Sequence, residues 1–231
     1  MKLLTGLFQS SLGKKFTMAA TGAALFGFVI AHLVGNLQIF LGPESLNRYG
    51  HFLQSNMEII WPARIGLLLM VGLHVWSAIK LSAENKAARP IGYVNAPVPV
   101  VASYASRTML MSGLIIAAFI VYHLLHFTVQ AKGINFTGTD FHTLHDAQQR
   151  HDVYGMMVKG FSNPLVSGFY ILAIGLLCLH LSHGVSAMFQ SLGLTNPAYK
   201  PVIQKFARGV AWAIFLGYAS IPAAVLLGLV K

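Results

Sequence analysis

The chain has 231 residues, of which 55% are hydrophobic and only 10% are charged, with a mean hydropathy of +0.64. This composition is typical of an integral membrane protein rather than a soluble domain. The formal net charge of +10 does not indicate nucleic-acid binding, because the basic residues are spread over the connections between apolar segments. The single cysteine, Cys178, excludes a disulfide framework and an iron–sulfur cluster held by this chain alone.

Five apolar segments are long enough to cross a bilayer, because a hydrocarbon core about 30 Å thick needs about 20 helical residues. They cover residues 16–41, 62–83, 107–130, 163–189 and 207–230. The sequence therefore predicts an all-α integral membrane protein, with five transmembrane helices in a single domain over residues 1–231. The first residues, MKLLTGLFQSSLGKK, have an interrupted apolar run and no small-residue cleavage site, so we expect no secretory signal there.

The charges between the spans predict the orientation. With a cytoplasmic N-terminus, the cytoplasmic side carries ten Lys and Arg residues and one Glu, a net charge of +9. The other side carries six basic and five acidic residues, a net charge of +1. Since Lys and Arg are enriched in cytoplasmic loops, we expect the N-terminus inside and the C-terminus outside. Residues 86–107 contain three prolines and are expected to form an irregular cytoplasmic connection.

Six of the ten histidines lie inside predicted spans, namely His32, His74, His123, His126, His180 and His183. An ionisable side chain at that depth is costly and indicates function by default, although a lone histidine can equally make a simple interhelical hydrogen bond. Each of the first four spans carries at least one histidine in its second half, and the fifth carries none. This distribution favours a shared function.

The histidines are expected to form two layers, because successive spans run in opposite directions. His32 and His123 fall in the outer half of the membrane, whereas His74 and the two histidines of span four fall in the inner half. His32 comes 17 residues after Lys15, and His123 comes 16 residues after Arg107. At 1.5 Å per residue, both lie about 25 Å from the inner boundary. A weak internal repeat, in which residues 21–36 align with 112–127, also matches His32 with His123.

Two opposed imidazoles suit haem iron better than zinc, because zinc takes three or four protein ligands whereas a porphyrin leaves only two axial positions. No CxxCH motif is present, so the haems would be of the noncovalent b type. Two histidines per iron leave no position for a substrate, which predicts electron transfer. Packing, a proton relay or another cation remain alternatives. Three histidines of the outer loop, His142, His145 and His151, are expected to form a solvated cap. A zinc cluster is the alternative, but it would lack a cysteine and a regular ligand spacing.

Five stretches carry a family resemblance: GAALFGFVIAHLVGN, YGHFLQSNMEIIWPAR, GLHVWSA, GLIIAAFIVYH and HLSHGVSAMFQSLG. With them, nearly the whole chain resembles the cytochrome b558 membrane-anchor subunit of succinate dehydrogenase/fumarate reductase, of the single-chain, five-helix, dihaem type. The resemblance implies that the first four helices form a four-helix bundle around two haems b. It implies His32 and His123 as iron ligands of the outer haem, and His74 and His180 as iron ligands of the inner haem.

Two of these ligands have neighbouring alternates. In span three, the family's glycine ten residues before the ligand fits His123, which leaves His126 as the alternate. In span four, the family's glycines four and thirteen residues after the ligand fit His180. A shallower depth and a faint repeat between HVWSA and HGVSA keep His183 as the alternate.

The resemblance also implies partners. The chain would anchor a flavoprotein, which carries FAD and the succinate/fumarate chemistry, and an iron–sulfur protein to a bacterial inner membrane. It would thus be the electron-transfer subunit of a succinate:quinone oxidoreductase (complex II) of the tricarboxylic acid cycle, with menaquinone as the membrane carrier and a possible oligomer of the whole complex. Alternatives are a dihaem cytochrome b of a hydrogenase or formate dehydrogenase, and a haem-free proton or metal transporter.

A quinone site needs an apolar slot and a group that exchanges protons. Glu58, just before span two and near the predicted outer haem, is the first candidate for this catalytic role. His51, Arg64 and Asn36 are further candidates on the same side, and His51 is not expected to bind haem. A solvated loop carboxylate is the alternative interpretation of Glu58.

Overall fold

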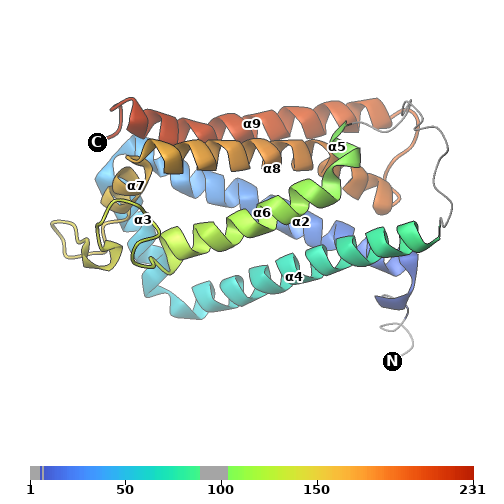
Figure 1. The fold of residues 1–231 in the computed structure, drawn as a ribbon, viewed down its shortest axis with the longest axis horizontal. Helices are drawn as coiled ribbons and strands as arrows, with labels where there is room; N and C mark the ends of the chain where they lie inside the picture. Colours follow the sequence, from blue (N-terminus) through green and yellow to red (C-terminus); the bar gives the residue numbers. More distant parts are fainter. Residues whose placement is uncertain (1–5, 7, 89–103) are drawn as a thin grey trace. The chain divides into compact units, whose positions relative to one another are not determined.

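A computed structural model describes residue 6 and residues 8–88 and 104–231, and the connection expected over 86–107 therefore lies mostly outside the described residues. Five long apolar helices confirm the predicted spans (Figure 1). They are α2 (Ser11–Asn36), α4 (Met57–Ala87), α6 (Met109–His123), α8 (Pro164–Ser191) and α9 (Lys200–Leu226). A 3-10 turn, η1 (Leu37–Leu41), continues α2, and a π-helical turn, η2 (Leu124–Thr128), continues α6. No strand is found in the described part of the chain.

Short helices fill connections that the sequence treats as loops. They are α3 (Pro43–Ser55), α5 (Tyr104–Arg107), η3 (Phe141–Thr143) and α7 (Val153–Phe161). Proline suits the first turn of a helix because its missing N–H would have no partner there, and α3 begins with Pro43. Asp152 is the N-cap of α7, and its carboxylate accepts from Gly155 N at 2.9 Å. These local signals start helices that are too short to register as spans.

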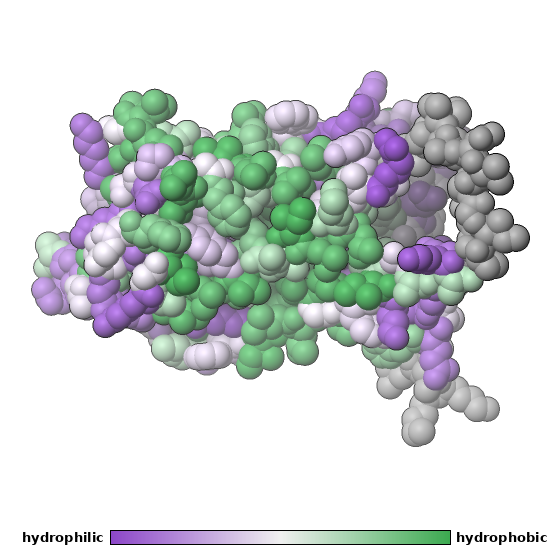
Figure 2. Space-filling model, in the orientation of Figure 1, coloured by the Kyte–Doolittle hydropathy of each residue, from purple (hydrophilic) through white to green (hydrophobic). Residues whose placement is uncertain are grey.

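The surface of the long helices is largely apolar, as the hydrophobic colouring of Figure 2 shows. Large aliphatic side chains on four of the helices are well exposed, for example Leu12, Leu69, Leu172 and Leu216. A helix that is hydrophobic all round is typical of a membrane span, where lipid rather than water covers such side chains. The exposed leucines are therefore consistent with a multi-pass membrane protein.

The chain divides into two compact units, and every long helix contributes a portion to each. Unit 1 holds the described residues of Met1–Gly27, Gly66–Leu114 and Leu179–Ala211. Unit 2 holds Phe28–Ile65, Ile115–Cys178 and Trp212–Lys231. His74 and His180 belong to unit 1, and His32 and His123 belong to unit 2. Each predicted pair of ligands thus lies within a single unit.

An ion pair between α2 and α4 stabilises unit 1. Lys14 is only 4% exposed, and its Nζ lies 2.5 Å from Glu84 Oε1. The same ammonium donates to the carbonyl of Gln9 at 2.9 Å. A buried charge is tolerated only with such partners, so these contacts fix the depth of α2 against α4.

Unit 2 contains a larger apolar core, which includes Ile39, Leu46, Met157, Phe161, Tyr170 and Ile221. Buried Asn47 of α3 ties the following loop to this core, because its Nδ2 donates to Asp152 at 2.9 Å and its Oδ1 accepts from Tyr154 N at 2.8 Å. Arg150 donates to Glu44 at 2.6 Å, and this hydrogen bond is the main reason that the pKa of Glu44 is lowered. The loop before α7 is therefore held by specific contacts to α3.

Candidate functional site

In unit 1, the imidazoles of His74 on α4 and His180 on α8 face each other, with ring centres 6.3 Å apart and planes inclined by 64°. His74 Nδ1 lies 3.1 Å from the Met18 carbonyl and 3.2 Å from Thr21 Oγ1. The Thr21 hydroxyl already donates to the Thr17 carbonyl at 2.7 Å, so its oxygen accepts from the ring. These contacts assign the proton of His74 to Nδ1 and leave the lone pair of Nε2 available.

His180 is held in the same way by α6. Its Nδ1 lies 3.3 Å from Ser112 Oγ, and the Ser112 hydroxyl contacts the Met109 carbonyl at 3.2 Å. When the serine proton is directed to that carbonyl, the serine oxygen accepts from His180 Nδ1, and Nε2 of His180 is then free to bind a metal, as it is in His74.

A glycine follows each of these hydroxyl residues, and its missing side chain leaves space for the histidine ring. A Cβ added to Gly22 would lie 3.3 Å from His74 Cε1, and a Cβ added to Gly113 would lie 3.3 Å from His180 Cε1. Thr21–Gly22 and Ser112–Gly113 occupy matching positions in the internal repeat. The two dipeptides, called the hydroxyl–glycine dipeptides below, thus do the same work on α2 and α6. The sequence carried this signal, but sequence reasoning used only the glycines and missed Thr21 and Ser112.

In unit 2, His32 on α2 and His123 at the end of α6 form a second facing pair, with ring centres 5.8 Å apart and planes inclined by 80°. Phe28 stacks on His32 at 5.2 Å. His123 Nδ1 lies 3.4 Å from the hydroxyl of Tyr170, which also lies 3.0 Å from His126 Nδ1. The sequence did not point to Tyr170, because this residue lies on α8, outside the two repeated segments.

The alternates of the predicted ligands lie elsewhere. His126, on the π turn η2, is only 1% exposed and stacks on Phe127 at 3.9 Å. Its Nε2 has no hydrogen-bond partner among the described residues. His183 is half-buried, and within the described part of the chain the ring that lies against His74 is that of His180. The structure thus places His32 beside His123 and His74 beside His180, which are the two pairs that the family resemblance implies.

The separation of the rings in each pair fits one metal ion between two imidazoles. With a metal–nitrogen distance of about 2 Å, opposed imidazoles place their ring centres roughly 6 Å apart. The observed separations are 5.8 and 6.3 Å. No group of three or more His, Cys, Asp or Glu side chains that could hold an ion occurs among the described residues. A metal here must therefore bring its remaining ligands, as haem iron does with four porphyrin nitrogens.

The residues predicted to act on a quinone do not converge on one another. Glu58, in the first turn of α4, is exposed, and so is His51 on α3. Arg64 lies over the ring of Trp61 at 5.5 Å. Asn36 Nδ2 donates to the carbonyl one turn earlier on its own helix, at 2.7 Å.

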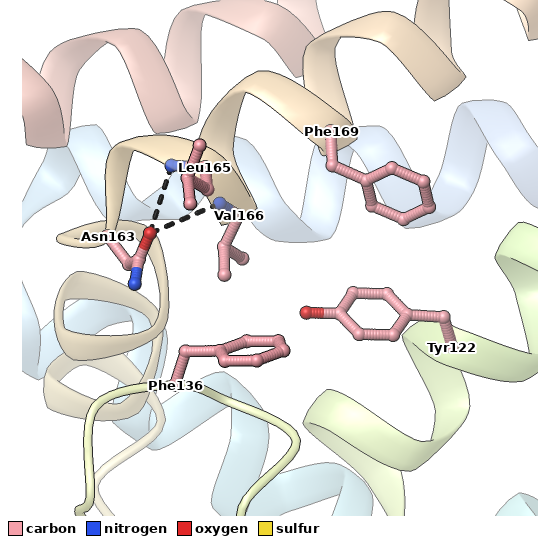
Figure 3. Close-up of a pocket in the computed structure, with 6 residues that line it drawn as sticks. All are labelled: Tyr122, Phe136, Asn163, Leu165, Val166 and Phe169. Atoms are coloured by element: carbon pink, nitrogen blue, oxygen red, sulfur yellow. Dashed lines mark hydrogen bonds between the residues drawn. The ribbon is translucent and has the colours of Figure 1, made fainter.

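An apolar pocket of about 270 Å³ lies elsewhere in unit 2 (Figure 3). It is lined by Tyr122, Phe136, Asn163, Leu165, Val166 and Phe169. The hydroxyl of Tyr122 points into this pocket. Asn163 Oδ1 accepts from Leu165 N at 2.9 Å, and its Nδ2 has no hydrogen-bond partner within the described ranges. The pocket therefore combines aromatic walls with two polar groups, close to the lower end of the roughly 300–1,000 Å³ typical of small-molecule sites.

The loop histidines are held by the loop itself. His145 and His151 form an isolated antiparallel bridge, and His151 Nε2 lies 3.0 Å from Gln130 Nε2. His142 Nε2 contacts a backbone carbonyl at 3.2 Å. Burial lowers the pKa of His151, which keeps this ring neutral near pH 7.

Comparisons with protein-family models, with curated proteins and with solved structures give no match for this chain. The functional conclusion therefore depends on the two histidine pairs, the groups that orient them and the membrane spans that carry them.

Proposed function

We propose that this chain is the membrane-anchor dihaem cytochrome b subunit of a succinate:quinone oxidoreductase, and that it passes electrons between an iron–sulfur subunit and menaquinone. The observation that supports this most strongly is the pairing of four membrane histidines, from four helices, into two sites of two imidazoles each. A haem b bound at each site would supply a one-electron couple. The two sites in one chain would provide successive electron carriers.

The side chains have distinct roles in this proposal. His74 and His180 would hold one haem, and His32 and His123 the other, each through Nε2. The hydroxyl–glycine dipeptides orient the first two rings, and the hydrogen bond to an oxygen makes an imidazole a better donor to a metal. With two imidazoles to hold each iron, neither site would leave a position for a substrate. The chemistry of succinate and fumarate would belong to a partner.

The remaining parts of the proposal follow from composition and charge. Cys178 is the chain's single cysteine, so iron–sulfur clusters must belong to a partner subunit. The charge excess on the N-terminal side supports a cytoplasmic N-terminus, with the flavoprotein and the iron–sulfur protein docked on that side of a bacterial inner membrane. The resemblance described above supports these partners and menaquinone.

Two places in unit 2 are candidates for the quinone. The pocket beside Tyr122 provides aromatic walls, and its two polar groups could meet a quinone carbonyl. Glu58 provides a carboxylate, but it is exposed and does not line this pocket. The two places are alternatives, because a carboxylate protonates a quinone only within hydrogen-bond reach. Turnover in Glu58→Gln and the KM for quinone in Asn163→Leu distinguish them.

The test of the whole proposal is a reduced-minus-oxidised visible spectrum of the purified chain, together with a haem assay. Two haems b per chain are expected, and protein without porphyrin would overturn the proposal in favour of a haem-free transporter. Co-purification with a flavoprotein that oxidises succinate separates this assignment from a hydrogenase or formate dehydrogenase subunit.

The role of Glu58 has its own test. Glu58→Gln should leave both haem spectra intact and abolish quinone-linked turnover, because the amide cannot exchange the proton. Asn163→Leu should raise the KM for quinone, because it removes a polar group from the pocket. Unchanged turnover in Glu58→Gln would remove Glu58 from the mechanism without affecting the haem assignment.

A further inference from the structure

Two buried side chains and one half-buried side chain of unit 2, Tyr170, His126 and His123, form a hydrogen-bonded row in which one hydroxyl lies between two imidazoles. The Tyr170 hydroxyl is 3.4 Å from His123 Nδ1 and 3.0 Å from His126 Nδ1. Tyr170 is 5% exposed and His126 is 1% exposed, so water does not compete for these contacts. We infer that Tyr170 is a positioning residue that couples the tautomers of the two histidines, so that the nitrogen of His123 that carries the proton determines which nitrogen of His126 carries one. This inference rests on the proposed function, in which His123 Nε2 binds iron.

Counting protons leaves two arrangements of this row. A phenol has one proton to donate and an oxygen that accepts, and a neutral imidazole has one N–H and one lone pair. In the first arrangement, His123 Nδ1–H donates to Tyr170, and Tyr170 donates to His126 Nδ1. In the second, His126 Nδ1–H donates to Tyr170, and Tyr170 donates to His123 Nδ1. The proton of His123 is then on Nε2, which cannot bind a metal.

Binding of iron by His123 therefore selects the first arrangement. His126 must then carry its proton on Nε2, the nitrogen that has no partner among the described residues. A Cβ on Gly160 would lie 2.8 Å from Phe127 Cε1 and 3.2 Å from this nitrogen, so both rings pack closely against a glycine. The tautomer of His126 thus reports the ligation of His123, although His126 itself does not touch the iron.

The His74/His180 pair differs in this respect. Thr21 directs its proton to the Thr17 carbonyl at 2.7 Å, so its oxygen can only accept from His74. His74 Nδ1 also lies 3.1 Å from the Met18 carbonyl, which can only accept, so the His74 proton stays on Nδ1 without any metal. The tautomer of His123 is instead left open by Tyr170 until a metal binds.

The test is nitrogen-15 NMR of histidine-labelled protein in the reduced state, with and without Tyr170→Phe. Wild-type protein with haem should show His126 protonated on Nε2 and His123 protonated on Nδ1. A His126 proton on Nδ1 would overturn the inference, and this measurement needs no variant. If the wild-type chain bound no haem, the proposed function would fail instead, so the two failures are distinguishable.

Tyr170→Phe gives a second measurement. The midpoint potential of the His32/His123 haem should rise, because His123 Nδ1–H loses its acceptor and the ring becomes a weaker donor to the oxidised iron. A tenfold change in the ratio of oxidised to reduced haem corresponds to 59 mV, and the expected shift is up to one such factor. The potential of the His74/His180 haem should not change.

Tyr218→Phe is the matched control, because its ring also packs on this histidine pair, 6.2 Å from His32, while its hydroxyl donates to the Val29 carbonyl at 2.8 Å. It should leave both potentials and the His126 tautomer unchanged. Equal shifts in Tyr170→Phe and Tyr218→Phe would assign the effect to packing and reject the role of the Tyr170 hydroxyl.

Discussion

The two histidine pairs use similar ligands but different supports. In unit 1, each ring is held by a hydroxyl and admitted by a glycine, and both come from the repeated segments of α2 and α6. In unit 2, His123 depends on Tyr170 of α8, and the His32 ring makes no hydrogen bond with the described residues. The repeat therefore contains the two ligands of unit 2, His32 and His123, and the two dipeptides that hold the ligands of unit 1. His123 relies on Tyr170, which lies outside the repeat.

The largest expected effect tests whether the two pairs are independent. Under the proposed function, His32→Ala should lower the haem content from two to one per chain, because a single imidazole would no longer hold the haem of unit 2. A pyridine haemochrome assay measures this ratio. His183→Ala is the control and should retain both haems, and loss of both haems in His32→Ala would contradict independent sites.

A smaller but still large effect is expected from filling the space beside His74. Gly22→Val places atoms against His74 Cε1, and overpacking of this kind costs about 1–3 kcal/mol. The haem of unit 1 should bind more weakly by roughly 5- to 150-fold on that scale. Gly27→Val on the same helix is the control, because nothing lies within 4 Å of its added Cβ. Haem release on denaturant titration measures the difference, and equal behaviour of the two variants would reject the steric explanation.

Removing one hydroxyl should shift a potential without loss of haem. Ser112→Ala deprives His180 Nδ1 of its acceptor, and a hydrogen bond contributes about 0.5–1.5 kcal/mol. The potential of the unit 1 haem should therefore rise by roughly 20–60 mV. Ser112→Thr should restore the potential, and Ser182→Ala should not change it, because Ser182 contacts its own helix at 2.8 Å. Redox titration would contradict this explanation if the His32/His123 haem shifted instead.

The smallest expected effect concerns the loop that packs on the second pair. Phe141 of this loop stacks on His126 at 5.8 Å, and Arg150 holds the loop to Glu44. Because the Arg150 hydrogen bond lowers the pKa of Glu44, its contribution to stability is complete above the unfolded pKa of about 4.3 and is lost as the pH falls through the folded pKa. Hydrogen exchange over residues 141–155 should accelerate only in acid in the wild type, and already at neutral pH in Glu44→Gln. Exchange that is identical in the two proteins at pH 7 would count against this role of the ion pair.

The sequence predicts the five spans well because their length and hydrophobicity are local properties. Span four, expected over 163–189, is observed as Pro164–Ser191. Alternating span directions and the family resemblance also group the histidines whose rings lie side by side, His32 with His123 and His74 with His180. The sequence does not identify Tyr170, because a tyrosine in a span has many possible partners and only the folded packing selects two imidazoles. The sequence also does not predict that Glu58 is absent from the lining of the pocket, because the lining depends on how the helices pack.

The two repeats align without a gap over residues 21–36 and 112–127, and their backbones diverge within the last four aligned positions. α2 continues as the tightly wound turn η1, whereas α6 changes to the wide turn η2, in which Val129 N bonds to the Leu124 carbonyl at 2.7 Å. Underwinding at this point gives His126 an angular position that it would not have in a regular helix. The surroundings of the histidine ligand therefore differ between the repeated segments of α2 and α6. The difference originates in the winding of five backbone residues, and not in a change of the ligand itself.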